Sequence, residues 1–367
     1  MAAICGWFSC FRSFAQKNEG SRRRGAIFKE TRPSIFVKIP LVKQQKTINR
    51  RFCVAPMMDC TDRHDRFLLR LISRHAVLYT EMVTTGALLF GDTAKFLDFN
   101  QAEHPVALQL GGSEPDGMTQ CAELAQKWGY DEVNINVGCP SDRVQSGSFG
   151  ACLMQSPELV AQNIKQMQAA VDIPVTVKSR IGVDDQVPKQ ALWELVDASA
   201  NAGCTVFLVH ARMAWLKGLS PKDNRTIPPL DYELVYQLKQ DFPELEIVLN
   251  GGINTIEQCH QHLAHVDGVM MGREAYSNPY LLSYVDKELY SDDSPVKSRE
   301  QVLDAYIEYT ESQLSNGCRL NQLSRHVVGL YHGEPRSRLW RRYISENAHL
   351  AGADTQVLAD AHQAMLA

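Results

Sequence analysis

Residues 132–154 read Glu132-Val-Asn-Ile-Asn-Val-Gly-Cys-Pro-Ser-Asp-Arg-Val-Gln-Ser-Gly-Ser-Phe-Gly-Ala-Cys-Leu-Met154. Polar and apolar side chains alternate at the start, which is the period of a strand with one polar face. Gly138 and Pro140 end this strand and hold Cys139 on a stiff turn between them. In parallel α/β proteins, functional residues gather at the carboxyl ends of strands. Cys139 is therefore a reactive thiol at such an end, or else a small side chain buried in a turn, the commoner fate of a free cysteine.

Seven further apolar runs of this kind each end in a polar or glycine-rich element. The predicted strands cover residues 52–55, 77–80, 106–108, 133–137, 175–177, 206–209, 247–249 and 268–271. Amphipathic helical patterns follow several of them, over residues 115–128, 156–171, 191–202 and 231–242. This order predicts a TIM (β/α)8 barrel. The alternative, a doubly wound sheet, would need a G-x-G-x-x-G motif after an early strand, and the sequence has none.

The regions on either side of the predicted barrel differ from it in composition. Residues 1–50 carry eleven of the 38 Lys and Arg residues and only two of the 42 acidic residues. We interpret residues 1–45 as a basic, poorly ordered extension; a transit peptide and a start codon placed too far upstream are the alternatives. We expect the barrel over residues 46–290, a linker over residues 291–297 and a small all-helical domain over residues 298–367.

The composition argues against several classes of protein. A hydrophobic content of 44% and a charged content of 22% are ordinary for a soluble domain. No apolar run approaches the roughly 18 residues that would cross a bilayer. The ten cysteines form no C-x-x-C pair, which argues against structural zinc and a disulfide framework. We therefore expect a cytoplasmic monomer without a metal or a membrane partner.

The predicted strand ends gather polar residues on one rim of the barrel. Gly251-Gly252 and Gly272 follow the last two strands, where TIM barrels commonly bind a phosphate through backbone N–H groups. Arg273 adds a charged donor beside them. A cofactor with one terminal phosphate fits this rim, and flavin mononucleotide (FMN) is the best candidate.

We make predictions for three more rim residues, two of them with an alternative. Lys178 suits the negative charge near N1 of a reduced flavin, unless it is an ordinary surface lysine. Gln109 offers both a donor and an acceptor to the pyrimidine edge of a flavin. His210 either contacts the cofactor or only hydrogen-bonds within the rim.

Two segments, Asn134–Pro140 and Phe149–Met154, closely resemble the signature of the tRNA-dihydrouridine synthases, and the resemblance extends from about Arg51 to about Asp354. It implies a flavin-dependent reduction of uridine to 5,6-dihydrouridine in tRNA, with NADPH reducing the FMN. The residues that match the family's flavin-binding positions are Ala55, Pro56, Met57, Gln109, Lys178, His210, Asn250, Gly251, Gly252, Gly272 and Arg273.

Shorter motifs are similar to those of the A subgroup of this family, which acts on U20 and U20a of the tRNA D-loop. They are Val83–Ala87, His210–Leu216, Gly218–Pro221, Pro228–Tyr232 and Trp340–Tyr343. One residue departs from the pattern, because Cys60 stands where the subgroup usually has Trp. The departure concerns the local packing beside the flavin.

Cys139 matches the proton donor of the family. A thiol is mostly protonated at neutral pH, because its usual pKa is about 8.5. Cys139 can thus give a proton to C5 of uracil while N5 of the flavin gives a hydride to C6. It is the predicted catalytic residue.

The target uracil must leave its stack to reach a recessed flavin, and phosphate contacts should dominate the affinity for tRNA. The expected tRNA contacts are Asn136, Arg143, Lys222, Arg225, Arg338 and Arg341. The last two belong to a basic face of the helical domain, made by Arg325, Arg336, Arg338, Arg341 and Arg342 and interleaved with His326, Trp340 and Tyr343.

Two other functions fit parts of the sequence. An FMN-dependent TIM-barrel oxidoreductase could act on a small molecule, but such an enzyme has no use for a basic helical domain. A tRNA-binding protein without catalysis would not need Cys139 and Lys178 on one rim.

Overall fold

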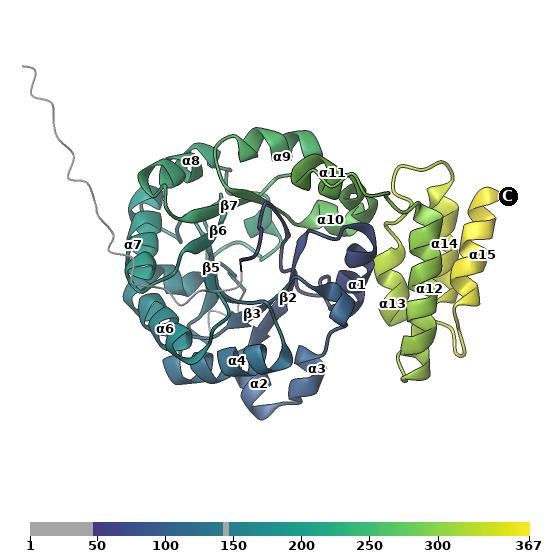
Figure 1. Cartoon of the computed structure of the whole chain (residues 1–367), viewed down its shortest axis with the longest axis horizontal. Coiled ribbons are helices and arrows are strands. Elements are labelled where there is room, and N and C mark those ends of the chain that lie inside the picture. Colours follow the sequence, from purple (N-terminus) through teal and green to yellow (C-terminus); the bar gives the residue numbers. More distant parts are fainter. Residues whose placement is uncertain (1–46, 142–146) are drawn as a thin grey trace, which may run out of the picture. The chain divides into compact units, whose positions relative to one another are not determined.

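The computed structural model describes residues 47–141 and 147–367. In these residues eight parallel strands form a closed barrel in chain order (Figure 1). They are β1 (Phe52–Val54), β2 (Val77–Thr84), β3 (Val106–Gly111), β4 (Glu132–Val137), β5 (Val175–Arg180), β6 (Val206–His210), β7 (Glu246–Asn250) and β8 (Gly268–Met271). Because β1 pairs with β8, the predicted TIM barrel is confirmed and the doubly wound sheet is excluded.

Helices surround the barrel and continue beyond it. Those up to the end of the expected barrel are α1 (Arg63–Ile72), α2 (Thr85–Phe90), α3 (Thr93–Leu97), α4 (Pro115–Trp128), α6 (Pro157–Ala170), α7 (Pro188–Asn201), α8 (Tyr232–Asp241), α9 (Ile256–Leu263), α10 (Arg273–Ser277) and α11 (Val285–Tyr290). Short 3-10 helices are η1 (Gln101–Glu103), η2 (Gly150–Gln155), η3 (Asp223–Arg225) and η4 (Pro279–Tyr284). Each of the four predicted helices is present, and α7 begins earlier than expected because Pro188 occupies its first position.

Three strands run at least three residues further than the sequence suggested. We expected β2 to end at Thr80, β3 at Leu108 and β5 at Val177, but they end at Thr84, Gly111 and Arg180. The polar residues that we expected to follow these strands therefore belong to the strands themselves. A barrel strand can carry such residues to its rim, because every second side chain faces the interior.

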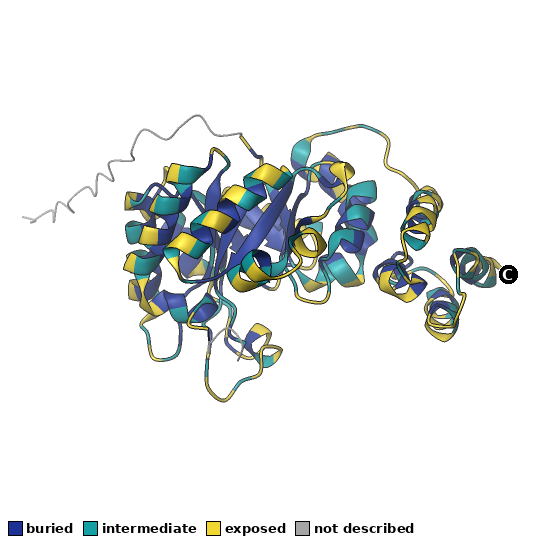
Figure 2. Cartoon of the chain, turned by 90° about the horizontal axis from the view of Figure 1, so that it is seen from below, coloured by how far each residue is buried: buried dark blue, intermediate teal, exposed yellow. Residues whose placement is uncertain are grey.

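The barrel has two apolar layers. Outward side chains such as Val133 and Ile135 belong to a large buried cluster that also contains residues of the surrounding helices. Inward side chains such as Cys53, Leu208 and Met270 form a separate cluster inside the barrel. Figure 2 shows the buried strands enclosed by helices whose outer faces are exposed. Both faces of each strand are thus covered, as parallel sheets require.

A polar group closes the amino-terminal end of the barrel. Arg50, two residues before β1, forms a buried ion pair with Glu132 at 2.7 Å. Glu132 also accepts hydrogen bonds from the hydroxyls of Tyr79 (2.8 Å) and Thr176 (2.5 Å). This buried charge pair is therefore satisfied by additional donors, the condition under which such a pair is tolerated.

The chain ends in helices α12 (Arg299–Ser315), α13 (Leu320–Val327), α14 (Ser337–Asn347) and α15 (Gln356–Leu366). Tyr309 of α12 stacks on Phe67 of α1 with ring centroids 3.8 Å apart. The expected interleaving of His326 and Trp340 with a basic face is wrong. His326 is buried beside Asp62, at 3.0 Å, and Trp340 is buried against Tyr331.

Two expectations concern other parts of the chain. Residues 1–45 lie outside the described residues. Within the described part, no helix has the length and apolar character that crossing a membrane requires.

Candidate active site

A cavity of about 950 Å³ is formed at the carboxyl ends of the strands. Its lining includes the candidate proton donor Cys139 and the expected tRNA contacts Asn136 and Arg225. It also includes every residue expected to bind the flavin, namely Ala55, Pro56, Met57, Gln109, Lys178, His210, Asn250, Gly251, Gly252, Gly272 and Arg273. The eight strand ends thus converge on one site.

The other expected tRNA contacts are not part of this lining. Lys222 is exposed in the loop before η3. Arg338 and Arg341 are exposed on α14. Arg143 lies outside the described residues.

The Cys139 turn is fixed by the side chain that precedes it on β4. The Asn136 amide oxygen accepts the backbone N–H groups of Gly138 (3.1 Å) and Cys139 (2.9 Å). The Cys139 carbonyl accepts the N–H of Ala151 at 2.9 Å. Its Sγ lies 3.5 Å from the hydroxyl of Ser141. Hydrogen bonds on both sides therefore present a half-buried thiol to the cavity.

Lys178 brings its amino group to the cavity, and among the described residues it has no carboxylate partner. Its Nζ donates to the Asn250 amide oxygen at 3.1 Å, and that amide in turn donates to the Met270 carbonyl at 2.8 Å. Burial, and after it the charge of Arg180, lowers the pKa of Lys178 to about 7. An anionic ligand would supply the missing counter-charge and favour the ammonium form.

Arg180 is a site residue that the sequence analysis missed. It lies two residues after Lys178, so period-two alternation places it on the same face of β5. Its guanidinium donates to the carbonyls of Gly138 (3.2 Å), Met213 (2.9 Å) and Asn224 (2.7 Å). Burial lowers the pKa of Arg180 to about 10. One buried cation thus joins the Cys139 turn to the loop that follows β6.

Gly251 and Gly252 make room for a ligand. Both have positive φ, +120° and +72°, which favours glycine. A Cβ on Gly251 would lie 2.8 Å from His210, and one on Gly252 would lie 2.7 Å from Leu230. Within the described chain neither N–H group meets an acceptor. Two unused donors beside an unpaired lysine fit an anionic cofactor such as a flavin phosphate.

His210 reaches the same part of the cavity from β6. Burial, followed by the charges of Arg180 and Lys178, holds the pKa of His210 well below its usual range. The imidazole is therefore neutral at physiological pH, so it can both donate and accept a hydrogen bond.

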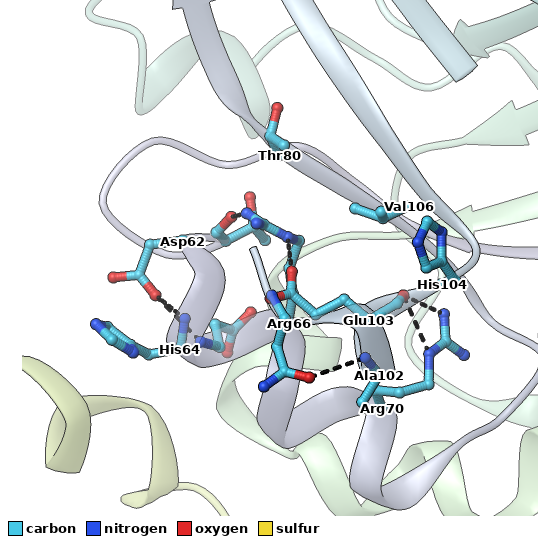
Figure 3. Close-up of polar contacts among 12 residues, drawn as sticks. Asp62, His64, Arg66, Arg70, Thr80, Ala102, Glu103, His104 and Val106 are labelled. Carbon is cyan, nitrogen blue, oxygen red and sulfur yellow. Dashed lines mark hydrogen bonds and ion pairs between the residues drawn. The ribbon is translucent and has the colours of Figure 1, made fainter. Parts of the chain in front are cut away.

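The loop between β1 and α1 is held in place by the buried charged side chains of Arg66 and Glu103 (Figure 3). Arg66 of α1 donates to Glu103 at 2.7 Å and to the Thr61 carbonyl at 2.9 Å. The Thr61 hydroxyl accepts the N–H of Met57 at 3.0 Å. Cys60, the departure from the subgroup pattern, is half-buried here, and burial followed by the charge of Asp65 raises its pKa to about 11. A neutral thiol thus stands in this loop.

One group among the described residues has ligand atoms near enough for a metal ion, namely His75, Asp286 and Asp292. None of these side chains lines the cavity. Arg74 lies 3.5 Å from Asp286 and 3.0 Å from Asp292, and His75 lies 2.9 Å from Asp292. The carboxylates are already balanced by these partners.

A TIM barrel whose rim combines an unpaired lysine, a glycine cradle and a fixed thiol belongs to the class of barrel enzymes that hold an anionic cofactor beside an acid. The family model "Dihydrouridine synthase (Dus)" matches residues 53–366. The chain therefore belongs to the dihydrouridine synthase family, flavin-dependent enzymes that reduce uridine in tRNA.

Relatives described as tRNA-dihydrouridine(20/20a) synthase match most of the chain. The one from Shewanella oneidensis is 56% identical over 324 residues, 88% of this chain and 96% of that protein. The one from Synechocystis sp. is 56% identical over 311 residues, 85% of this chain and 93% of that protein. The one from Escherichia coli is 55% identical over 312 residues, 85% of this chain and 94% of that protein.

Proposed function

We propose that this chain reduces U20 and U20a of the tRNA D-loop to 5,6-dihydrouridine, with FMN as the bound flavin and NADPH as its reductant. The observation that carries the proposal is the shared cavity of Cys139, Lys178 and the Gly251-Gly252 cradle. The positions 20 and 20a come from the descriptions of the relatives.

We assign different roles in cofactor binding and proton transfer to the residues of the cavity. The N–H groups of Gly251 and Gly252, with Arg273, would hold the phosphate of FMN. Lys178 would stabilise negative charge on the flavin ring, and Gln109 would orient it. When bound, the reduced flavin supplies a hydride to C6 of uracil. Cys139 gives the matching proton to C5, so that the ring gains two hydrogens.

The tRNA surface extends beyond the cavity. Arg225 lines the cavity, and Lys222 is nearby in sequence. We propose that helices α12–α15 form a tRNA-binding domain, because Arg338 and Arg341 are exposed and form no ion pair within the described residues. Asn136 and Arg143 remain predicted contacts. We expect the enzyme to act as a monomer in the cytoplasm.

The test uses purified protein, FMN, NADPH and an unmodified tRNA transcript. Mass spectrometry of nuclease fragments should show two added hydrogens on the fragment that contains U20 and U20a. A transcript with cytidine at both positions is the control. A protein that binds and reduces FMN but leaves the uridine transcript unchanged would refute the proposal.

A further inference from the structure

A chain of buried hydrogen bonds rises from the floor of the barrel toward the cavity. Thr176 Oγ1 donates to Glu132 Oε1 at 2.5 Å. Asn134 Nδ2 donates to Thr176 Oγ1 at 2.8 Å, and Gln109 Nε2 donates to Asn134 Oδ1 at 2.7 Å. The strand register explains the order, because Gln109, Asn134 and Thr176 are paired neighbours across β3, β4 and β5.

The same chain continues to the Cys139 turn. Asn136 Nδ2 donates to Gln109 Oε1 at 2.8 Å. Asn136 Oδ1 accepts the N–H groups of Gly138 and Cys139. The carboxylate at one end of the barrel is thus connected, through three amides and one hydroxyl, to the turn that carries the thiol at the other end.

Glu132 gives this chain its direction. Arg50 donates to Glu132 Oε2 through Nε and Nη2, both at 2.7 Å, and an ionised carboxylate can only accept. The Thr176 hydroxyl must then donate to Glu132 and accept from Asn134. Each amide further along has one orientation that satisfies both its neighbours.

Burial removes the alternatives. Glu132, Asn134 and Thr176 are completely buried, and Gln109 is 1% exposed. Water is therefore not available to replace a lost partner of Glu132, Asn134 or Thr176, and an amide turned the wrong way would leave buried donors facing each other.

We infer that Glu132 and Thr176 are positioning residues, which fix the amide orientations of Gln109 and Asn136 and through them the flavin and the Cys139 turn. The inference rests on the proposed function. It predicts that the Gln109 amide has one fixed orientation, so that its free N–H and its free lone pair always point to the same two places in the cavity. It also predicts that an oxygen, never an N–H, of Asn136 faces the Cys139 turn.

Glu132→Gln tests the donor-to-acceptor direction of the hydrogen-bond chain, because glutamine has almost the same shape as glutamate. Because Arg50 can only donate, it turns the oxygen of the new amide toward itself and the NH2 toward Thr176. The Thr176 hydroxyl loses its acceptor, and the amides above it are driven toward the reversed orientation. We expect FMN binding to weaken by roughly tenfold or more, with a shifted visible spectrum of the bound flavin.

Glu246→Gln is the matched control. Glu246 lies 3.0 Å from Arg50, so this variant removes the same charge from the same arginine, but Glu246 takes no part in the chain. A loss of FMN affinity that Glu246→Gln shares would assign the effect to Arg50 and overturn the inference.

Thr176→Val and Thr176→Ser provide a second pair. The valine removes the hydroxyl at nearly constant volume and should weaken FMN binding as Glu132→Gln does, whereas the serine keeps the hydroxyl and should restore it. Wild-type affinity and spectrum in both Glu132→Gln and Thr176→Val would refute the inference.

A readout on the flavin-free protein separates this inference from the proposed function. We expect the alkylation rate of Cys139 by iodoacetamide, followed by peptide mass spectrometry, to change in Glu132→Gln and Thr176→Val but not in Glu246→Gln. Cys152 serves as the internal reference thiol. If wild-type protein binds no FMN, the proposed function fails; if Cys139 alkylation is the same in all variants, the positioning role fails.

Discussion

The proposed role of Cys139 as proton donor predicts that its loss slows one half-reaction and not the other. In the proposed reaction NADPH would reduce the flavin before any uracil is present, so Cys139→Ala should leave this step near the wild-type rate. Reoxidation by tRNA should slow by about 10²–10⁴-fold, the usual cost of a lost general acid. This corresponds to about 3–5 kcal/mol of barrier. Stopped-flow absorbance of the two half-reactions gives the comparison.

Cys152 is the matched control for this experiment. It lies in η2, thirteen positions further along the family signature, and it does not line the cavity. Cys152→Ala should therefore reoxidise with tRNA at the wild-type rate. If Cys152→Ala lost the reaction and Cys139→Ala kept it, the assignment of the acid would be wrong.

Lys178 should make the stability of the flavin-free protein depend on pH. Its pKa is about 7 in the folded chain and about 10.4 when unfolded. Between these values the unfolded chain binds more protons, so the contribution of Lys178 to stability rises with pH, and its full cost is present below pH 7. Lys178→Met removes this cost. Because Lys178 is partly open to the cavity, we expect a gain of about 1–2 kcal/mol at pH 6.

Chemical denaturation of flavin-free wild type and Lys178→Met, from pH 6 to pH 10, measures this difference. The advantage of the variant should shrink as the pH rises above 7, while its FMN affinity should be lower throughout. A constant difference in unfolding free energy across this range would show that Lys178 does not titrate as described.

The strands show how far an alternating pattern can be interpreted. Alternation from Glu132 to Val137 predicted β4, and it also places Glu132, Asn134 and Asn136 on one face. It cannot say which groups those side chains meet, because Gln109 and Thr176 come from other strands. The existence of eight strands and the gathering of the candidate flavin-binding residues around one cavity were therefore predictable. The hydrogen-bond chain and the contacts of Arg180 were not, because they depend on contacts between strands.

Helix α14 carries the clearest prediction about tRNA affinity. Arg338 and Arg341 are one turn apart on this helix and are exposed, so both can meet phosphates on one face. Replacing each with Ala should weaken binding uniformly across tRNA sequences. It should also lower the slope of log affinity against log salt by about one. Lys165, exposed on α6, is the control, and an equal loss in Lys165→Ala would count against α14 as the phosphate contact.

The contact between the barrel and the C-terminal helices lay beyond prediction from sequence. Arg325 donates to Asp62 at 2.5 Å across 263 positions of the chain, and no local pattern reports so distant a partner. A run of arginines suggests a solvated basic face, yet Arg325 is ion-paired here and its neighbour His326 is buried. Asp62 also caps α1 by accepting the N–H groups of His64 and Asp65, so one carboxylate joins two parts of the chain.

Asp62→Asn tests how much the contacts of the Asp62 carboxylate contribute to the free energy of unfolding. Asparagine caps helices as well as aspartate does, so the substitution removes the charge and keeps the cap. Burial alone would raise the pKa of Asp62, but the hydrogen bond and charge of His326 hold it well below its usual range. A carboxylate of this kind stabilises the fold above its unfolded pKa of about 3.9 and loses that contribution as the pH falls. We expect the variant to be less stable by about 1–3 kcal/mol at pH 7, with the difference shrinking below about pH 4.

Asp98→Asn is the comparison, since Asp98 pairs with Arg63 where both side chains are substantially exposed. Exposed pairs contribute about 0–1 kcal/mol, so this variant should unfold close to wild type in the same denaturant series. Asp62 bonds to α13, and α13 contacts α14, which bears Arg338 and Arg341, through the Trp340–Val327 hydrogen bond. The Asp62→Asn protein should therefore also bind tRNA more weakly while retaining its affinity for FMN. Equal stability of the two variants at pH 7 would show that the carboxylate of Asp62 does not join these helices to the barrel.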